Sequence, residues 1–358
     1  MSELSIIFAS QNCEWEQTIK SADSYDFYHL PSYHTLHEKQ GDGAGTLLVY
    51  EEGDKFIALP LMVREISQIP GLETFTDYRD ATSVYGYPGP ITNAAARGDQ
   101  AFIARFHQQL NRYALSQGWV SVFSRLNPLL KNHQLLPLHG EIIGLSDTVI
   151  IDLGLTEEEQ TAYYRKSHRY EVRRARREGM EVHHDAEWAN YEVFIDLYHR
   201  TMQRVHAAPH YFFNRTYFDD LRTALGDRLR LYVATMNGNI CAASLFVKTQ
   251  NIIEYHLSAS SDDCLKWAPS KLIIDEARQW GKASGAHWLH LGGGVGSQED
   301  ALFRFKAGFS PLRRRFFIWK WIVQPQIYEQ LVRKREQWFR KHNESIPDSS
   351  YFPSYRRP

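Results

Sequence analysis

Two runs of alternating helix and strand patterns follow one another along the chain. In the first run, apolar stretches flank a turn centred on Gly53 and predict a hairpin over 46–65. Apolar residues at helical spacing then predict a helix that ends at Gly118. Strand patterns follow over 119–126 and 147–154.

The second run begins at Thr156. Thr156 and Glu159 have the spacing of a capping box, and we expect one helix from there to Gly179. After two more helices, an Asn-Gly pair at 237–238 predicts the first turn of a three-stranded antiparallel meander. A helix with Pro269 in its first turn, a strand, a short helix and a final strand complete the run.

The similar order of elements predicts an α+β fold of two tandem domains, each a mixed, mostly antiparallel sheet flanked by helices. A chain of 358 residues is also too long for one ordinary core. We assign residues 1–155 to the first domain and 156–317 to the second, and we expect the segment 318–358 to pack back on the first.

Composition narrows the possible partners and the compartment. The net charge of −1 provides no global field that would recruit nucleic acid or a membrane, so any basic patch must be local. The three cysteines are widely spaced without a CxxC pair, which argues against a disulfide framework or a zinc site. With no signal peptide and no run of 18 apolar residues, we expect a cytoplasmic protein without a membrane span.

The stretch LHLGGGVGSQEDALFRFKAGFSP, at 289–311, has four glycines within five positions. No Lys follows them in the Walker A arrangement, and they do not complete a GxGxxG turn inside a parallel βαβ unit. A nucleotide loop is therefore disfavoured. Two interpretations stay open: a strand-to-helix turn with positive φ, or a wall formed by Gly293 and Gly294 where the backbone lies close to a substrate.

Seven cations gather in the helix predicted after Thr156, namely Arg165, Lys166, Arg169, Arg173, Arg174, Arg176 and Arg177. Arg165, Arg169 and Arg173 are four residues apart and would share one helix face. That face is either solvated or binds a phosphate-rich partner, such as RNA, a nucleotide-sugar diphosphate or a lipid diphosphate. Interleaved tyrosines favour RNA.

We expect no metal and no permanently bound cofactor. The adjacent His183 and His184 would point to opposite faces of a strand and make a poor chelate. The order of elements agrees with the GNAT superfamily of acetyltransferases, but the segment 258–277 lacks that superfamily's glycine loop for the pyrophosphate of acetyl-CoA. Pro269 also removes one amide that a pyrophosphate would use.

Five segments resemble the Fem family of peptidoglycan-bridge aminoacyltransferases. They are YHLPSYHTL, YYRKSHRYEVRRARREGMEV, YHRTMQRVHAAPHYFFNRTYFDDL, APSKLIIDEARQWGKASGAHWLHLGG and LFRFKAGFSP. The resemblance covers most of the chain and is strongest from Thr156 to Pro311. It implies two GNAT-like domains and an aminoacyl-tRNA donor. The coiled-coil arm of some tRNA-dependent members is not evident, so an acyl-CoA donor stays open.

The resemblance also implies roles for individual residues. Phe305 and Lys306 match the family's Phe-Lys pair as catalytic residues, where the Lys steadies the developing oxyanion or the donor ester; a preorganised ammonium suits that task. Arg204 matches an arginine that contacts the acceptor's diphosphate. With the glycine wall and the basic helix, the expected substrate-binding residues are Arg204, Tyr211, Phe212, Tyr255, Gly293, Gly294, Arg165, Arg169 and Arg173.

Three functions follow as hypotheses. The first is a Fem-like acyltransferase that uses aminoacyl-tRNA to form an amide on a nucleotide- or lipid-linked sugar precursor of the cell envelope, with tRNA held by the basic helix 165–177. The second keeps the fold and takes acyl-CoA as donor for an amino sugar or similar amine. The third is a non-catalytic protein that binds RNA or glycan.

Overall fold

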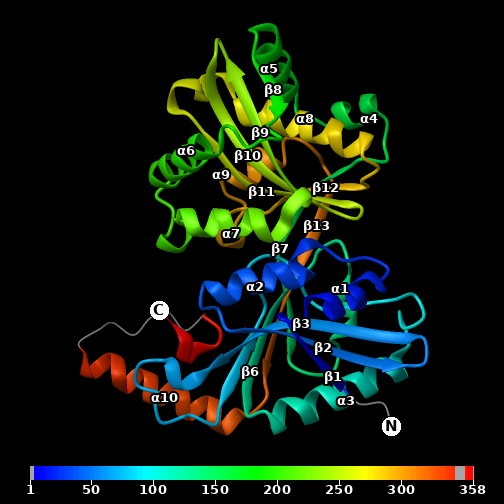
Figure 1. The fold of residues 1–358 in the computed structure, drawn as a ribbon, viewed down its shortest axis with the longest axis vertical. Helices are drawn as coiled ribbons and strands as arrows, with labels where there is room; N and C mark the ends of the chain where they lie inside the picture. The colour runs from blue at the N-terminus through cyan, green and yellow to red at the C-terminus, as the bar shows by residue number, and fades with distance from the viewer. Residues whose placement is uncertain (1–3, 343–350, 358) are drawn as a thin grey trace. The chain divides into compact units, whose positions relative to one another are not determined.

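Helices and strands divide between two units in the computed structural model, which describes residues 4–342 and 351–357. The first unit is formed by residues 1–145 together with 316–358, and the second by 146–315. The sequence suggested divisions at 155/156 and 317/318. Figure 1 shows that both units combine a sheet with covering helices, and the predicted α+β class is confirmed.

The sheet of the first unit has the strand order β1-β2-β3-β4-β6-β13, and β5 pairs with β3. All neighbours are antiparallel except β4 and β6. The strands are β1 Leu4–Phe8, β2 Ala44–Glu52, β3 Lys55–Glu65, β4 Arg79–Thr82, β5 Ile91–Thr92, β6 Trp119–Leu126 and β13 Arg313–Ile322. The helices are α1 Asn12–Lys20, η1 Phe27–His29, α2 Pro31–Lys39, η2 Ile66–Gln68, α3 Gln100–Ser116, η3 Asn132–Leu135, α10 Pro325–Lys341 and η8 Ser354–Arg356.

The predicted elements of this unit are present. β2 and β3 pair as the expected hairpin, and α3 is followed by Gly118 with a positive φ of 67°. The apolar face of α3 packs on β2, β3 and β6 in one core, to which Trp319 and Trp321 of β13 also belong. Residues 343–350 of the C-terminal tail lie outside the described residues. Tyr355, beyond them, is buried in a second cluster of this unit with Leu331 of α10.

The sheet of the second unit has the order β7-β12-β11-β10-β9-β8, antiparallel except where β11 meets β12. The strands are β7 Glu141–Asp152, β8 Glu181–His184, β9 Leu229–Met236, β10 Asn239–Thr249, β11 Ile252–Ser260 and β12 Trp288–Gly292. The helices are α4 Glu157–Ala162, α5 Lys166–Arg177, α6 Tyr191–Arg204, η4 Pro209–Tyr211, α7 Arg215–Leu225, η5 Gly226–Arg228, η6 Asp262–Trp267, α8 Pro269–Ala283, η7 Val295–Ser297 and α9 Ala301–Lys306.

The meander β9-β10-β11 forms where the sequence predicts it. Asn237 and Gly238 both have positive φ, which is the geometry that a tight hairpin turn requires. One face of the meander carries an apolar core with α5 and α8, to which Phe246 and Leu272 belong. α6 packs against β10 and β11 without sharing in that core, so it covers the other face.

The single helix expected from Thr156 to Gly179 is wrong. The capping box of Thr156 and Glu159 forms, but α4 ends at Ala162 and α5 begins only at Lys166. Arg165 is extended between them, with φ −55° and ψ 144°, and its N–H donates to the Gly308 carbonyl at 2.7 Å. The break buries the Tyr164 ring, whose hydroxyl donates to Asp275 of α8 at 2.8 Å. A tertiary contact therefore outweighs helix continuity.

The sequence analysis argued against a disulfide framework, but two of the three cysteines form a disulfide. Cys241 at the start of β10 and Cys264 in η6 are joined in a disulfide, with their Cα atoms 5.3 Å apart. The two lie 23 residues apart in the sequence. The Ser261 N–H donates to the Cys241 carbonyl at 2.9 Å and brings the two segments together. The Cα–Cα distance of 5.3 Å is within the range that a disulfide bridges.

Within residues 4–342 and 351–357, no helix has the length and apolar character needed to cross a lipid bilayer.

Candidate active site

Lys306 is the last residue of α9, and its side chain is buried. Asp300 caps the start of this helix by accepting the Phe303 N–H at 2.8 Å. The Lys306 ammonium donates to the Gly293 carbonyl at 2.7 Å. Burial lowers the pKa of Lys306 to about 8, against the opposing attraction of Asp300 and Glu254. A substantial share of this lysine is thus neutral near pH 8, in contrast with an ordinary surface lysine.

The glycine loop between β12 and α9 surrounds that ammonium. Gly292 has a φ of +75°, and a Cβ there would lie 3.3 Å from the Lys306 Nζ. The Val295 N–H donates to Asp300 at 3.2 Å. The loop therefore presents a carbonyl oxygen to a cation and uses an amide on the protein's own carboxylate. A phosphate loop would do the reverse and aim its amides at an anion.

A buried acid and a buried histidine lie beside this loop. Glu254 of β11 and His290 of β12 are register neighbours on adjacent parallel strands, and both are buried. His290 Nδ1–H donates to the two Glu254 oxygens at 2.8 and 2.7 Å. The sequence analysis missed this pair. Its signal was a charged or titratable residue in the middle of each of two apolar strands, since such residues are seldom buried without a partner.

Phe305 points into the apolar core of the second unit. Its ring lies 5.7 Å from the Phe309 ring and 6.0 Å from the His168 ring. His168 Nε2–H donates to the Phe305 carbonyl at 2.9 Å, and burial lowers the pKa of His168. Phe305 thus fixes the end of α9 against α5, while the Lys306 side chain reaches the glycine loop.

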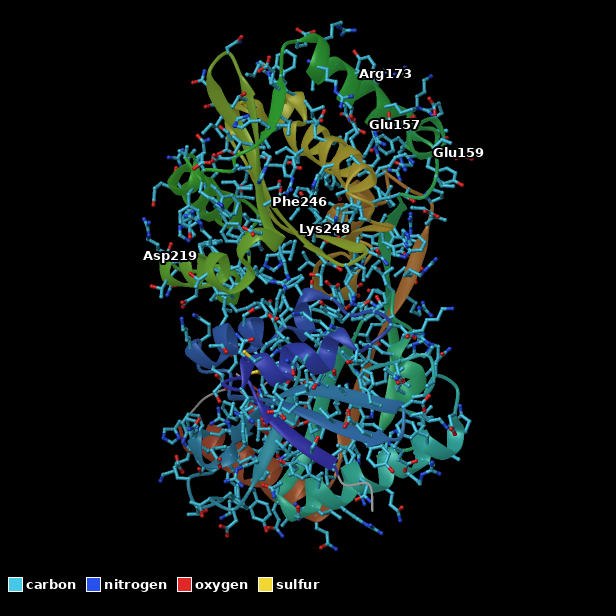
Figure 2. All side chains as sticks on the ribbon, turned by 45° about the vertical axis from the view of Figure 1, so that its right-hand side comes forward. Glu157, Glu159, Arg173, Asp219, Phe246 and Lys248 are labelled. Carbon is cyan, nitrogen blue, oxygen red and sulfur yellow. A yellow bond between two sulfur atoms is a disulfide. The ribbon has the colours of Figure 1, made fainter. Side chains whose placement is uncertain are left out.

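The basic helix presents its cations unequally. Arg176 pairs with Asp275 at 2.8 Å and with Glu276, and the Arg174 guanidinium lies 4.6 Å from the Trp267 ring centre. Arg169 donates to the Ala162 carbonyl at 3.1 Å. Figure 2 shows Arg173 on α5, where its side chain is exposed.

Arg165 is exposed as well, but it precedes α5 in extended conformation. Arg165 therefore does not share a helix face with Arg169 and Arg173, as the sequence analysis expected, because it lies outside α5. Within the described residues, neither Arg165 nor Arg173 takes part in an ion pair. Both guanidinium groups are therefore available to a partner's anion.

Arg204 ends α6 and is held at the far end of β11. Its Nη1 donates to the Ser260 carbonyl at 3.0 Å and to Asp262 at 2.5 Å. Ser260 is six positions along β11 from Glu254, which corresponds to roughly 20 Å of strand. Tyr211 and Phe212 follow in the connection between α6 and α7, where Phe212 is 40% exposed.

Tyr255 lies next to Glu254 on β11 but points to the opposite face of the sheet. Its ring is 5.3 Å from Phe246, in the core shared with α8. Burial raises the pKa of Tyr255 to about 12. A phenol of this kind stays protonated at neutral pH and serves as a hydrogen-bond donor.

Of the residues singled out in the sequence, the structure brings Lys306, Gly293 and Gly294 into one cluster and packs Phe305 on its other side. Arg204, Tyr211 and Phe212 form a separate group around the end of α6. In the part of the chain that the structure describes, no group of three or more His, Cys, Asp or Glu side chains is arranged to hold a metal ion.

Known proteins resemble this chain in sequence and in fold. Residues 162–306 match the acetyltransferase (GNAT) domain family. The UDP-N-acetylmuramoylpentapeptide-lysine N(6)-alanyltransferase of Weissella viridescens is 27% identical over 166 residues, which are 45% of this chain and 48% of that protein. The match thus spans about half the length of this relative.

Two solved structures match over both units. The crystal structure of FemX has a TM-score of 0.67 at 13% identity and covers 89% of this chain and 98% of its own. L-PGS from Bacillus licheniformis has a TM-score of 0.53 at 15% identity and covers 87% and 91%. At these identities the likeness concerns the fold.

Proposed function

We propose that the chain is a Fem-like acyltransferase with GNAT-like domains that forms an amide bond on an amino group of a cell-envelope precursor. The observation that carries this proposal is the buried ammonium of Lys306, fixed by the Gly293 carbonyl at the mouth of the glycine loop. The acceptor class, a nucleotide- or lipid-linked sugar precursor, is supported by the substrate in the name of the Weissella viridescens relative.

The chemistry requires stabilisation of negative charge on oxygen. The acceptor amine attacks the carbonyl carbon of the donor ester, a C–N bond forms, and the carbonyl oxygen becomes an oxyanion. The Lys306 ammonium stabilises this oxyanion in a low-dielectric site, where one preorganised donor contributes about 3 kcal/mol. The ester C–O bond then breaks, the amine proton passes to substrate or water, and the leaving hydroxyl takes a proton.

Aminoacyl-tRNA is the proposed donor. At the start of α8, where a GNAT enzyme would hold the pyrophosphate of acyl-CoA, Pro269 occupies the first helical position and supplies no N–H. The Lys271 N–H donates to the Ala268 carbonyl at 3.0 Å. The exposed Arg165 and Arg173 are the proposed contacts for the phosphates of tRNA.

Acyl-CoA is the alternative donor. The observation that favours it is the match of residues 162–306 to an acetyltransferase domain family. The two donors differ in a simple assay. The protein is incubated with UDP-N-acetylmuramoyl-pentapeptide and either alanyl-tRNA or acetyl-CoA, and acyl transfer to the peptide is followed by mass spectrometry. We expect transfer from alanyl-tRNA; turnover with acetyl-CoA alone contradicts the proposed donor.

Lys306→Ala should lower turnover at least tenfold while the melting temperature shows that the protein remains folded. Because the ammonium is the active form and its pKa is about 8, the wild-type rate should fall as the pH rises above 8. In Lys306→Arg the charge persists, so any remaining activity should lack this alkaline decline. An unchanged rate in Lys306→Ala removes this residue from the mechanism.

A further inference from the structure

The buried pair of Glu254 and His290 has no part in the chemistry described so far. Both side chains lie in the interior of the sheet, on neighbouring strands, and share two short hydrogen bonds. Burying an ionised carboxylate costs several kcal/mol unless other groups compensate for the lost water. Such a pair in the centre of a sheet therefore calls for a role beyond packing.

The pair lies close to Lys306, because His290 stands two positions before Gly292 on β12, and a Cβ at Gly292 would lie 3.3 Å from the Lys306 Nζ. Among the groups that attract the Lys306 ammonium are Asp300, at the start of α9, and Glu254, from β11. The loop contributes the Gly293 carbonyl, and His290 belongs to β12, the strand that leads into the loop. The charged or titratable groups around the ammonium are thus Asp300, Glu254 and His290.

The two carboxylates are not equivalent. Asp300 exerts the larger attraction on the ammonium, and it also accepts the Phe303 N–H at 2.8 Å and the Val295 N–H at 3.2 Å, so its replacement would disturb the loop and the cap of α9 as well. Glu254 pairs with His290 at 2.7 Å. It acts on the ammonium through the low-dielectric interior, where the effect of a charge extends further than in water.

We propose that Glu254, oriented by His290, is a positioning residue that keeps the Lys306 side chain charged and directed at the glycine loop. The role of Lys306 in acyl transfer rests on the function proposed above, but the electrostatic coupling does not depend on it. His290 orients the carboxylate with both hydrogen bonds. The charge of Glu254 is thereby held in the N-terminal part of β11, where this strand pairs with β12.

The test is Glu254→Gln, with the ionisation of Lys306 measured directly from the ¹⁵Nζ resonance in lysine-labelled full-length protein. Lys306→Arg identifies the resonance by its absence. Without the carboxylate the Lys306 pKa should fall by about one unit below its wild-type value, which reduces the ammonium fraction up to about tenfold on the alkaline side. The alkaline decline of the transfer rate should move to lower pH by the same interval.

A matched control separates coupling from instability. Asp275→Asn removes another buried carboxylate of the same unit, which pairs with Arg278 at 3.1 Å and with Arg176. This variant should be less stable without a change in the Lys306 pKa or the pH profile. His290→Gln gives a second test should Glu254→Gln fold poorly, and it should lower the Lys306 pKa in the same direction.

The outcomes are distinguishable. A Lys306 pKa that is unchanged in both Glu254→Gln and His290→Gln overturns the positioning role. A shifted pKa without acyl transfer by the wild-type protein from either donor supports the coupling and contradicts the proposed function. In a Lys306→Arg background, Glu254→Gln should no longer move the alkaline limb, because the guanidinium stays charged at every pH used.

Discussion

Gly293 and Gly294 are adjacent in the glycine loop but differ in the space around their α-carbons. A Cβ at Gly293 would meet the Asp147 carbonyl at 3.4 Å, an ordinary contact. At Gly294 it would lie 2.0 Å from the Gln298 carbonyl and 2.4 Å from Asp300. Gly294 has φ −87°, so the obstacle there is space and not backbone conformation.

Gly293→Ala should therefore be tolerated, whereas Gly294→Ala should cost about 1–3 kcal/mol of unfolding free energy. The displaced Asp300 would also release the cap of α9 and move Lys306, so acyl transfer should fall in Gly294→Ala alone. Urea unfolding and the transfer assay on the two variants measure both effects. Equal stability of the two proteins would show that the loop relaxes freely.

Some residues of the candidate site could be predicted from the sequence, and others could not. Lys306 was predicted as a site residue because Phe305 and Lys306 match the Phe-Lys pair of the family that the sequence resembles, and in the structure it is buried at the glycine loop. Glu254 and His290 were not, since their pairing depends on the register of β11 with β12 across 36 residues of sequence. No local pattern contains that register.

At the scale of elements, local signals were sufficient wherever a turn or a cap specifies the structure. The capping box of Thr156 and the turn at Asn237 are encoded within four residues and form as predicted. The end of α4 is different, because it is set by the hydrogen bond of Tyr164 to Asp275, 111 residues away. The helical pattern of apolar positions continues across this break, so the end of α4 cannot be predicted without the tertiary contact.

The disulfide between Cys241 and Cys264 should stabilise the connection from β11 to α8. The chain-entropy model assigns about 3 kcal/mol to a closed loop of this length. In unfolded, unreduced protein, alkylation should label Cys13 alone; after reduction it should label all three cysteines. Reduction should lower the melting temperature, and Cys241→Ser should reproduce the loss without a reductant. Labelling of all three cysteines before reduction would contradict the bond.

At the scale of the whole molecule, the α+β class and the tandem order of elements were predictable because each strand and helix carries its own pattern of apolar positions. The sequence analysis also assigned the C-terminal segment 318–358 to the first domain, but it did not predict which core this segment would join. The first unit includes residues 316–358, whose Trp319 and Trp321 join a core built around α3, some 200 residues earlier in the chain. Burial of this kind is decided by the completed sheet.

His29, His34 and His107, which are among the buried histidines described in the first unit, should make it sensitive to acid. Burial lowers the pKa of His29 to about 4, of His34 to about 3 and of His107 to about 4. Each is neutral in the folded protein and takes up a proton near pH 6.5 when unfolded. Unfolding therefore binds more protons below pH 6.5, and stability falls as the pH falls towards 4.

At pH 5 each of these histidines should cost about 2 kcal/mol of unfolding free energy relative to pH 8. Hydrogen exchange followed by mass spectrometry should show loss of amide protection in α2 and α3 as the pH is lowered from 7 to 5. His34→Gln should reduce this dependence, because glutamine does not titrate. The matched control is His183→Gln, which replaces an exposed histidine on β8 and should leave the pH dependence of α2 and α3 unchanged. Equal acid sensitivity in the wild-type protein and His34→Gln would show that His34 does not contribute to the acid sensitivity.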